Sequence, residues 1–115
     1  MKIRTVYHKV KNLEQAKNFW EAFFGIVPSS SSEIWCAFKL ENVNFALLLT
    51  DPADGFQGTN CVPVFEMKED EIGPAVIKAK ALGCEMVFDG LNDPDVQSIV
   101  LFDPFGNEFE ISKIH

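Results

Sequence analysis

Few residues in this chain could carry acid–base, metal or nucleophilic chemistry. Its two histidines are His8 and His115, and its three cysteines are Cys36, Cys61 and Cys84. No CxxC pair exists, so a zinc knuckle or a thioredoxin-type site is not favoured. Nothing basic adjoins a cysteine in sequence to lower its pKa, which favours buried thiols in a reducing compartment over a reactive nucleophile. Glycine-rich phosphate loops and Ser-His-Asp spacings are also absent, so any chemistry must rest mainly on carboxylates.

The carboxylates are numerous but unevenly placed. The 115 residues hold 17 acidic and 10 basic side chains, a formal charge of −7. Residues 1–24 hold five basic and two acidic groups, whereas residues 51–115 hold four basic and thirteen acidic groups. This balance disfavours nucleic acid and an acidic membrane surface as partners. Asp93-Pro94-Asp95 could attract a cation, but such a run is more typical of a solvated loop.

Hydrophobic periodicity shows which elements would position these groups. In the first half, Asn12 is a candidate N-cap, apolar residues recur at three- and four-residue steps to Phe24, and Gly25 ends the helix. The pattern predicts β, α, β, β, β over residues 3–10, 13–24, 26–28, 34–40 and 43–50, with 29–32 as a polar turn. The second half repeats this plan, with Gly83 after the helix. Its predicted elements cover residues 61–67, 70 or 71 to 82, 84–88, 96–102 and 109–114.

This repeat defines the expected fold. We predict a single α+β domain over residues 1–115, in which two βαβββ modules form a half-open barrel or cleft. The first module covers about 1–50, the connector 51–59, and the second module about 60–115. One helix covers only one face of each sheet, so the other faces can line a ligand cleft.

Two motifs support a family resemblance. They are Val10-Lys11-Asn12-Leu13-Glu14-Gln15-Ala16, with Phe19-Trp20 and Phe24-Gly25 after it, and the ending Phe102-Asp103-Pro104-Phe105-Gly106-Asn107-Glu108-Phe109-Glu110. Together they resemble the vicinal oxygen chelate superfamily, which includes glyoxalases, bleomycin-resistance proteins and extradiol dioxygenases. Taken alone, the Asp103–Asn107 stretch predicts a tight hairpin turn with Gly106 at positive φ.

The resemblance also identifies the positions at which metal-dependent members hold their cation. They fall on Thr5, Leu48, Val62 and Glu110, in the first, fourth, fifth and eighth strands. A divalent cation needs several nitrogen or oxygen donors at once, and only Glu110 supplies a carboxylate. We therefore expect no metal and no other cofactor.

Strand alternation predicts which side chains line the cleft. In the first strand Thr5, Tyr7 and Lys9 face it, whereas His8 points toward the helix as a structural histidine. The remaining predicted cleft residues are Trp35, Ala37, Asn44, Ala46, Leu48, Glu108 and Glu110, with Val62, Val64, Gln97 and Ile99 in strands that alternation does not phase. The ligand-binding set predicted from these is Thr5, Tyr7, Trp35, Asn44, Leu48, Val62 and Glu110.

This wall predicts a protein that binds a small aromatic or cationic compound without turnover. Tyr7 and Trp35 would grip a flat ligand, and Glu110 or Asn44 would orient it. Two alternatives remain open: a lyase or dioxygenase with an atypical metal arrangement, and an interaction module with a vestigial pocket. Trp35 could also fill the barrel interior, and Glu110 could pair with Lys9 or Arg4. We expect a cytoplasmic protein, and the resemblance implies a homodimer.

Overall fold

A computed structural model describes residues 3–50 and 62–114 of the chain. The chain divides into two compact units, Met1–Gly58 and Thr59–His115, which we call unit 1 and unit 2. Each unit contains one helix and one four-stranded sheet. The predicted connector 51–59 and Cys61 lie outside the described residues.

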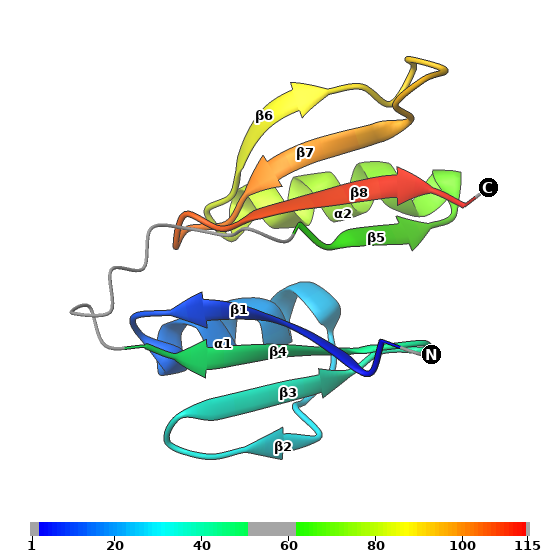
Figure 1. The fold of residues 1–115 in the computed structure, drawn as a ribbon. Coiled ribbons are helices and arrows are strands. Elements are labelled where there is room, and N and C mark those ends of the chain that lie inside the picture. The colour runs from blue at the N-terminus through cyan, green and yellow to red at the C-terminus, as the bar shows by residue number, and fades with distance from the viewer. Residues whose placement is uncertain (1–2, 51–61, 115) are drawn as a thin grey trace. The chain divides into compact units, whose positions relative to one another are not determined.

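Unit 1 has the predicted βαβββ order. Its elements are β1 (Thr5–Val10), α1 (Leu13–Phe24), β2 (Ser30–Ser31), β3 (Trp35–Lys39) and β4 (Asn44–Leu49). The strand order across the sheet is β1-β4-β3-β2, in which β1 runs parallel to β4 and the other pairs are antiparallel (Figure 1).

The predicted position of the second strand is wrong. The apolar residues 26–28 lie outside the sheet, and β2 forms instead at Ser30–Ser31, where the pattern predicts a polar turn. Ser30 pairs with Ala37 and Ser31 with Cys36. Backbone pairing at the sheet edge therefore overrides side-chain propensity here, and Val27 is left 73% exposed.

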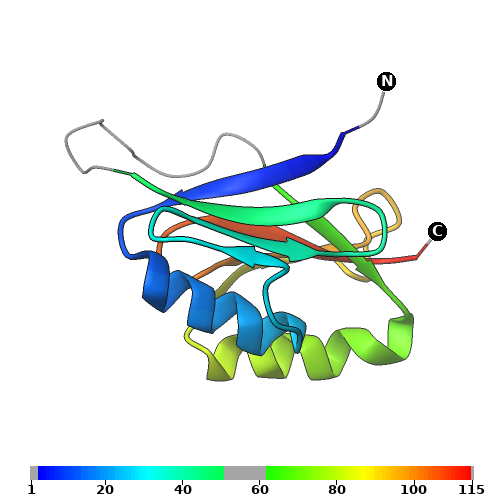
Figure 2. The ribbon, with the colours of Figure 1, turned by 90° about the horizontal axis from the view of Figure 1, so that it is seen from below.

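The helix α1 follows its sequence signals closely. The Asn12 side chain accepts a hydrogen bond from the Gln15 backbone N–H at 3.0 Å, and Gly25 ends the helix at φ 71°. The inward stripe is buried against one face of the sheet, as Figure 2 shows for the helix as a whole. Trp20 forms the centre of this core, with its ring 4.6 Å from that of Phe45. The aromatic stripe of α1 is therefore core.

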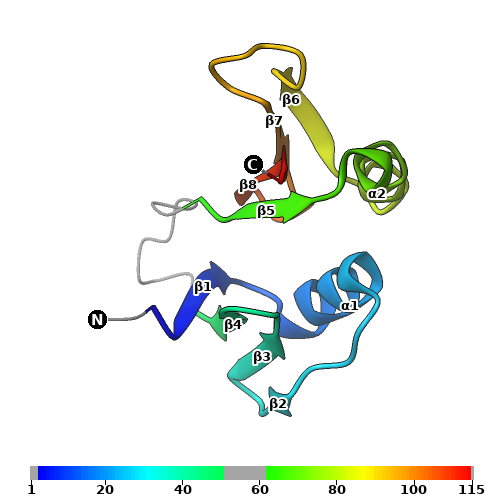
Figure 3. The same ribbon diagram turned by 90° about the vertical axis from the view of Figure 1, so that its right-hand side faces the viewer.

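Unit 2 repeats the arrangement. Its elements are β5 (Val64–Met67), α2 (Glu69–Ala81), β6 (Glu85–Asp89), β7 (Ser98–Phe102) and β8 (Glu108–Lys113). The strand order is β5-β8-β7-β6, with β5 parallel to β8, and α2 lies along one side of the sheet (Figure 3). Ile72 and Ala79 of α2 are buried, together with Phe109 and Ile111 of β8. These residues form the core of the unit.

The Asp103–Asn107 turn joins β7 to β8 as predicted. The Asp103 carboxylate accepts hydrogen bonds from the backbone N–H groups of Phe105 and Asn107, at 3.0 and 2.8 Å. Gly106 adopts φ 86°, which a residue with a side chain rarely tolerates. The motif therefore acts as a hairpin device.

The α+β class and the two βαβββ modules are confirmed. Both sheets are open, and the described strands form no closed barrel. Neither of the two described helices is long and apolar enough to cross a bilayer.

Candidate functional site: the open sheet faces

The face of the unit 1 sheet that α1 does not cover is the first part of the candidate site. Strand register sets its members side by side: Tyr7 pairs with Ala46, which pairs with Ala37. The next rows on either side follow the same order across β1, β4 and β3. We call this surface the open face of unit 1; it comprises Thr5, Tyr7, Lys9, Trp35, Ala37, Lys39, Asn44, Ala46 and Leu48.

An aromatic pair dominates this face. The rings of Tyr7 and Trp35 meet edge to face with centroids 5.6 Å apart, from opposite sides of β4. Tyr7 remains 46% exposed, whereas Ala46 and Ala37 are 0% and 7% exposed. The two alanines thus form a buried floor beside two large rings, one of which is open to solvent.

The opposite side of β1 contains His8, as predicted. His8 is 1% exposed, and its ring packs edge to face against Trp20 at 5.9 Å and Phe45 at 5.0 Å. Burial lowers the pKa of His8 to about 4, so the ring is neutral at pH 7. His8 is therefore a core residue, which excludes it from the open face.

The uncovered face of the unit 2 sheet is the second part. We call it the open face of unit 2; its strand residues are Val64, Glu66, Glu85, Phe88, Ser98, Val100, Phe102, Glu108, Glu110 and Ser112. Glu110 is half-buried at its centre, between Val64 and Val100. The Ser98 hydroxyl donates a hydrogen bond to the Glu110 carboxylate at 2.7 Å, which fixes the carboxylate orientation.

The predicted site residues divide between these two faces. Thr5, Tyr7, Trp35, Asn44 and Leu48 come together on unit 1, and Glu110 lies on unit 2. Val62 lies two residues before β5 and is half-buried. The strand begins only after Pro63, because proline has no N–H with which to extend the ladder. The Pro63 carbonyl instead accepts the Glu110 backbone N–H at 3.0 Å.

The prediction of Ile99 as a cleft residue is wrong, and Gln97 lies outside the seventh strand. Ile99 is 4% exposed and pairs with Ile111 on the α2 side of the sheet. Gln97 precedes β7 and has φ 56°, which breaks the alternation that would have phased the strand. The true face residues of β7 are Ser98, Val100 and Phe102, which sequence reasoning missed. The alternation of β8 assigns Glu108 and Glu110 to the open face, and the residues of β7 that pair with them would have been assigned to the same face.

The four positions implied for a metal do not suit one. Thr5 offers a hydroxyl, Leu48 and Val62 offer no donor, and the Glu110 carboxylate already accepts from Ser98. Divalent cations in proteins need several oxygen or nitrogen donors. Among the described residues, no group of three His, Cys, Asp or Glu side chains is placed to hold a metal ion.

The described thiols are poor nucleophiles. Cys36 and Cys84 are buried free cysteines. Burial raises the pKa of both, that of Cys84 to about 12 with a smaller contribution from the nearby Asp103 charge. Neither thiol forms appreciable thiolate at neutral pH.

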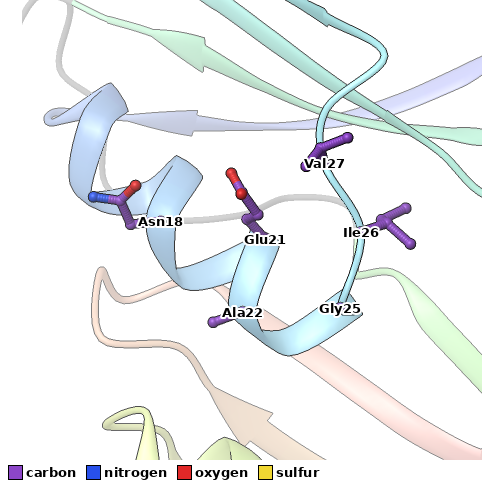
Figure 4. A pocket seen from close by; sticks show the side chains of 6 residues that line it. All are labelled: Asn18, Glu21, Ala22, Gly25, Ile26 and Val27. Atoms are coloured by element: carbon purple, nitrogen blue, oxygen red, sulfur yellow. The ribbon is translucent and has the colours of Figure 1, made fainter.

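A hollow of about 380 Å³ shares no lining residue with either open face. It lies beside the C-terminal half of α1, and Figure 4 shows the side chains around it: Asn18, Glu21, Ala22, Gly25, Ile26 and Val27. All of these except Glu21 are exposed, so the hollow is a shallow surface depression. The only charged side chain among its lining residues is the Glu21 carboxylate.

Comparison with known proteins identifies the fold. No protein-family model and no curated protein matches the sequence. Among solved structures, a glyoxalase/bleomycin resistance protein/dioxygenase family enzyme from Burkholderia phytofirmans PsJN is similar over 100% of both chains, with a TM-score of 0.79 and 16% identity. A glyoxalase/bleomycin resistance protein from Albidiferax ferrireducens T118 is similar over 98% of both chains, with a TM-score of 0.75 and 20% identity.

A third similar structure is the genomically encoded fosfomycin resistance protein FosX from Listeria monocytogenes. It matches over 100% of this chain and 93% of its own, with a TM-score of 0.74 and 22% identity. The chain therefore has the two-module fold of the glyoxalase/bleomycin resistance proteins, as the sequence resemblance implied. At these identities the likeness establishes the fold alone.

Proposed function

We propose that this protein binds a small aromatic or cationic organic compound on its open sheet faces, without a resident metal and without turnover. The observation that carries the proposal is the Tyr7–Trp35 ring pair, in which Tyr7 is 46% exposed and Trp35 is half-buried. A partly exposed aromatic pair on a mostly apolar wall is a typical surface for stacking a flat ligand.

The cationic preference rests on unit 2. Glu110 is half-buried, and Glu66 and Glu108 lie on neighbouring positions of the same face. Phe102 pairs with Glu108 across the ladder. An ammonium group would gain a charge-assisted hydrogen bond from the oriented Glu110 carboxylate, together with contact to the apolar side chains around it.

The absence of a metal is proposed from the donor set. One carboxylate and one hydroxyl fall short of the three or more protein ligands that catalytic cations usually take. Without a metal, turnover would need a positioned acid–base pair. Among the described strand positions, only the open face of unit 2 holds carboxylates, and neither open face holds a histidine or a cysteine.

We propose a homodimer in the cytoplasm as the working form. Exposed apolar side chains outside both open faces, Val27 at 73% and Ile77 at 71%, are surface that association would cover. The free thiols Cys36 and Cys84 accord with a reducing compartment. Light scattering during size exclusion measures the mass, and a monomer at micromolar concentration would contradict the dimer.

Binding is tested with the neutral probe naphthalenemethanol, followed by NMR of the ¹⁵N-labelled protein. We expect Trp35→Leu to weaken binding by about tenfold, because it removes a stacking surface worth about 1 kcal/mol or more. Ile77→Ala removes an exposed apolar side chain on α2, outside both open faces, and should leave this affinity unchanged. Equal affinities for the wild type and both variants would contradict the proposed aromatic site.

The metal-free proposal is tested separately by elemental analysis of the purified protein. We expect less than a tenth of an equivalent of nickel, zinc, iron or manganese. A near-stoichiometric metal that Glu110→Gln abolishes would contradict it, and would favour the lyase or dioxygenase alternative.

A further inference from the structure

We propose that the open face of unit 1 is specific for aromatic anions, such as an aryl carboxylate, and that the cationic preference is confined to unit 2. This inference rests on the proposed function and assigns the ligand class of its aromatic site. It starts from the charges that strand register places beside the Tyr7–Trp35 pair.

Two lysines flank the aromatic pair. Lys9 pairs with Leu48, in the same row as Trp35, and Lys39 pairs with Asn44, in the same row as Thr5. They therefore lie at diagonally opposite corners of the face, on β1 and on β3. No acidic residue occupies any of the face's strand positions within the described chain. The charged strand positions of this face are therefore lysines only.

The distances suit one planar ring system. Adjacent rows on one face are two residues apart, about 7 Å along the strand, and neighbouring strands are about 5 Å apart. Because Ala46 and Ala37 are buried, the surface open to a ligand is the Tyr7 ring with the exposed part of Trp35, which a bicyclic aromatic can cover. Lysine side chains are long and flexible enough for either ammonium group to reach an anionic substituent at the edge of such a ring.

Both ammonium groups are available to a ligand. Lys9 and Lys39 are exposed, and neither forms an ion pair with a described residue. The Asn44 amide lies in the row of Lys39 and can donate a further hydrogen bond to a carboxylate. An anion therefore gains from these groups without first breaking an ion pair to any of residues 3–50 or 62–114.

The open face of unit 2 has the opposite character. Its charged strand residues are the carboxylates Glu66, Glu85, Glu108 and Glu110, with no lysine or arginine among its described positions. An aromatic anion would be repelled there, whereas an aromatic cation would be attracted. The two faces therefore separate ligands by charge rather than by shape.

The experiment uses three probes that share one ring system: naphthoate, naphthalenemethanol and naphthylmethylammonium. Each is titrated into the ¹⁵N-labelled protein at pH 7, with the Trp35 indole N–H signal as the reporter for unit 1. We expect naphthoate to bind there about fivefold more tightly than the alcohol, and the ammonium probe more weakly than the alcohol.

Substitution of the lysines tests whether Lys9 and Lys39 cause the preference for the anionic probe. Lys9→Gln and Lys39→Gln should each weaken naphthoate binding by about threefold and leave the alcohol unchanged. Lys17→Gln makes the same charge change on α1, which covers the other side of the same sheet, and should have no effect. All three substitutions are at solvent-accessible positions, and amide spectra confirm folding before titration.

Two failures are distinguishable. If the ammonium probe binds at Trp35 as tightly as naphthoate, the charge inference is overturned and the aromatic site of the proposed function stands. If none of the three probes shifts the Trp35 signal, the proposed function fails and this inference fails with it.

Discussion

The orientation of the Glu110 carboxylate is set by one hydrogen bond, from the Ser98 hydroxyl. Ser98 is buried and donates to Glu110 at 2.7 Å, so the carboxylate is held in one orientation within a mostly apolar neighbourhood. A carboxylate held in this way loses little conformational entropy when a cation binds. Ser98 is therefore a positioning residue for the proposed cation site.

Replacing Ser98 with alanine should separate orientation from charge. We expect Ser98→Ala to weaken binding of naphthylmethylammonium to unit 2 by about fivefold, because Glu110 keeps its charge but loses its donor. The affinity is measured by NMR titration at the unit 2 amide signals.

Ser112→Ala is the matched control. Ser112 is the cross-strand neighbour of Ser98 on the same face, but its hydroxyl donates to the Gln97 carbonyl at 3.3 Å and not to Glu110. Equal losses in the two variants would show that any small cavity on this face is responsible, and would refute the positioning role of Ser98.

At the scale of elements, the first turn of α1 shows a clear sequence-to-structure link. The Asn12 side chain satisfies the Gln15 backbone N–H, which otherwise has no partner within the helix. We expect Asn12→Ala to lower the free energy of unfolding by about 1 kcal/mol. Asn12→Asp keeps the acceptor and should restore wild-type stability in urea denaturation, so a loss common to both variants would exclude the cap as the cause.

The loop from β6 to β7 depends on a glycine without a side chain. A Cβ at Gly90 would lie 2.6 Å from Phe88 Cε1, 2.8 Å from Val96 Cγ1 and 3.0 Å from the Ser98 carbonyl oxygen. Gly90→Ala should therefore cost about 1–3 kcal/mol and displace the Phe88 ring on the open face of unit 2.

Gly73→Ala provides the control for this substitution. Gly73 lies in α2, where an added Cβ would meet nothing within 4 Å, so alanine should stabilise the helix by up to about 1 kcal/mol. Thermal unfolding of both variants tests whether the added Cβ at Gly90 is destabilising. A Gly90→Ala protein as stable as the wild type would mean that the loop relaxes without cost.

Elements with a strong periodicity are predictable from the sequence, and those set by pairing are not. The alternation of β1, β3 and β4 identifies all eight predicted unit 1 residues of the open face, because each strand has one side that faces α1. In unit 2, the register shift between Met86 and Phe88 and the positive φ of Gln97 interrupt the alternation. Such irregularities arise from tertiary packing, so Phe88 and Phe102 could not be assigned to a face beforehand.

At the scale of the whole molecule, the net charge of −7 conceals two surfaces of opposite sign. The open face of unit 1 carries lysines only, and that of unit 2 carries carboxylates only, among the described strand positions. A repeated module has thus kept one backbone plan while its two copies present different chemistry. Such divergence is expected where strand positions facing solvent are free to vary without loss of the core.

Among the described residues, each unit also buries one titratable group other than a cysteine whose pKa is strongly shifted. Burial lowers the pKa of His8 in unit 1 from 6.5 to about 4, so its stabilising effect is lost as the pH falls from 6.5 to 4. Burial raises the pKa of Asp103 in unit 2 from 3.8 to about 6, against the opposing effect of its hydrogen bonds with Phe105 and Asn107. Its stabilising effect is complete below pH 3.8 and is lost as the pH rises to 6.

The two effects should therefore cancel between about pH 4 and 6. Each shift corresponds to about 3 kcal/mol, with opposite dependence on pH, and the slopes add in a transition that unfolds both units. From these two groups together we expect almost no change in the free energy of unfolding over this range. In His8→Gln only the pH dependence due to Asp103 remains, so the free energy of unfolding should fall by about 3 kcal/mol from about pH 4 to 6. Asp103→Asn keeps an oxygen acceptor for the turn and should show the reverse slope.

Urea denaturation of the three proteins at about pH 4, 5 and 6 separates these slopes from any general loss of stability. A cavity or a weakened turn lowers the free energy of unfolding equally at every pH, whereas removal of a titrating group changes its slope. Opposite slopes in the two variants would locate the balance in His8 and Asp103. Parallel profiles for all three proteins would mean that neither group has the shifted pKa that its burial implies, and that the pH dependence arises from the exposed carboxylates of unit 2.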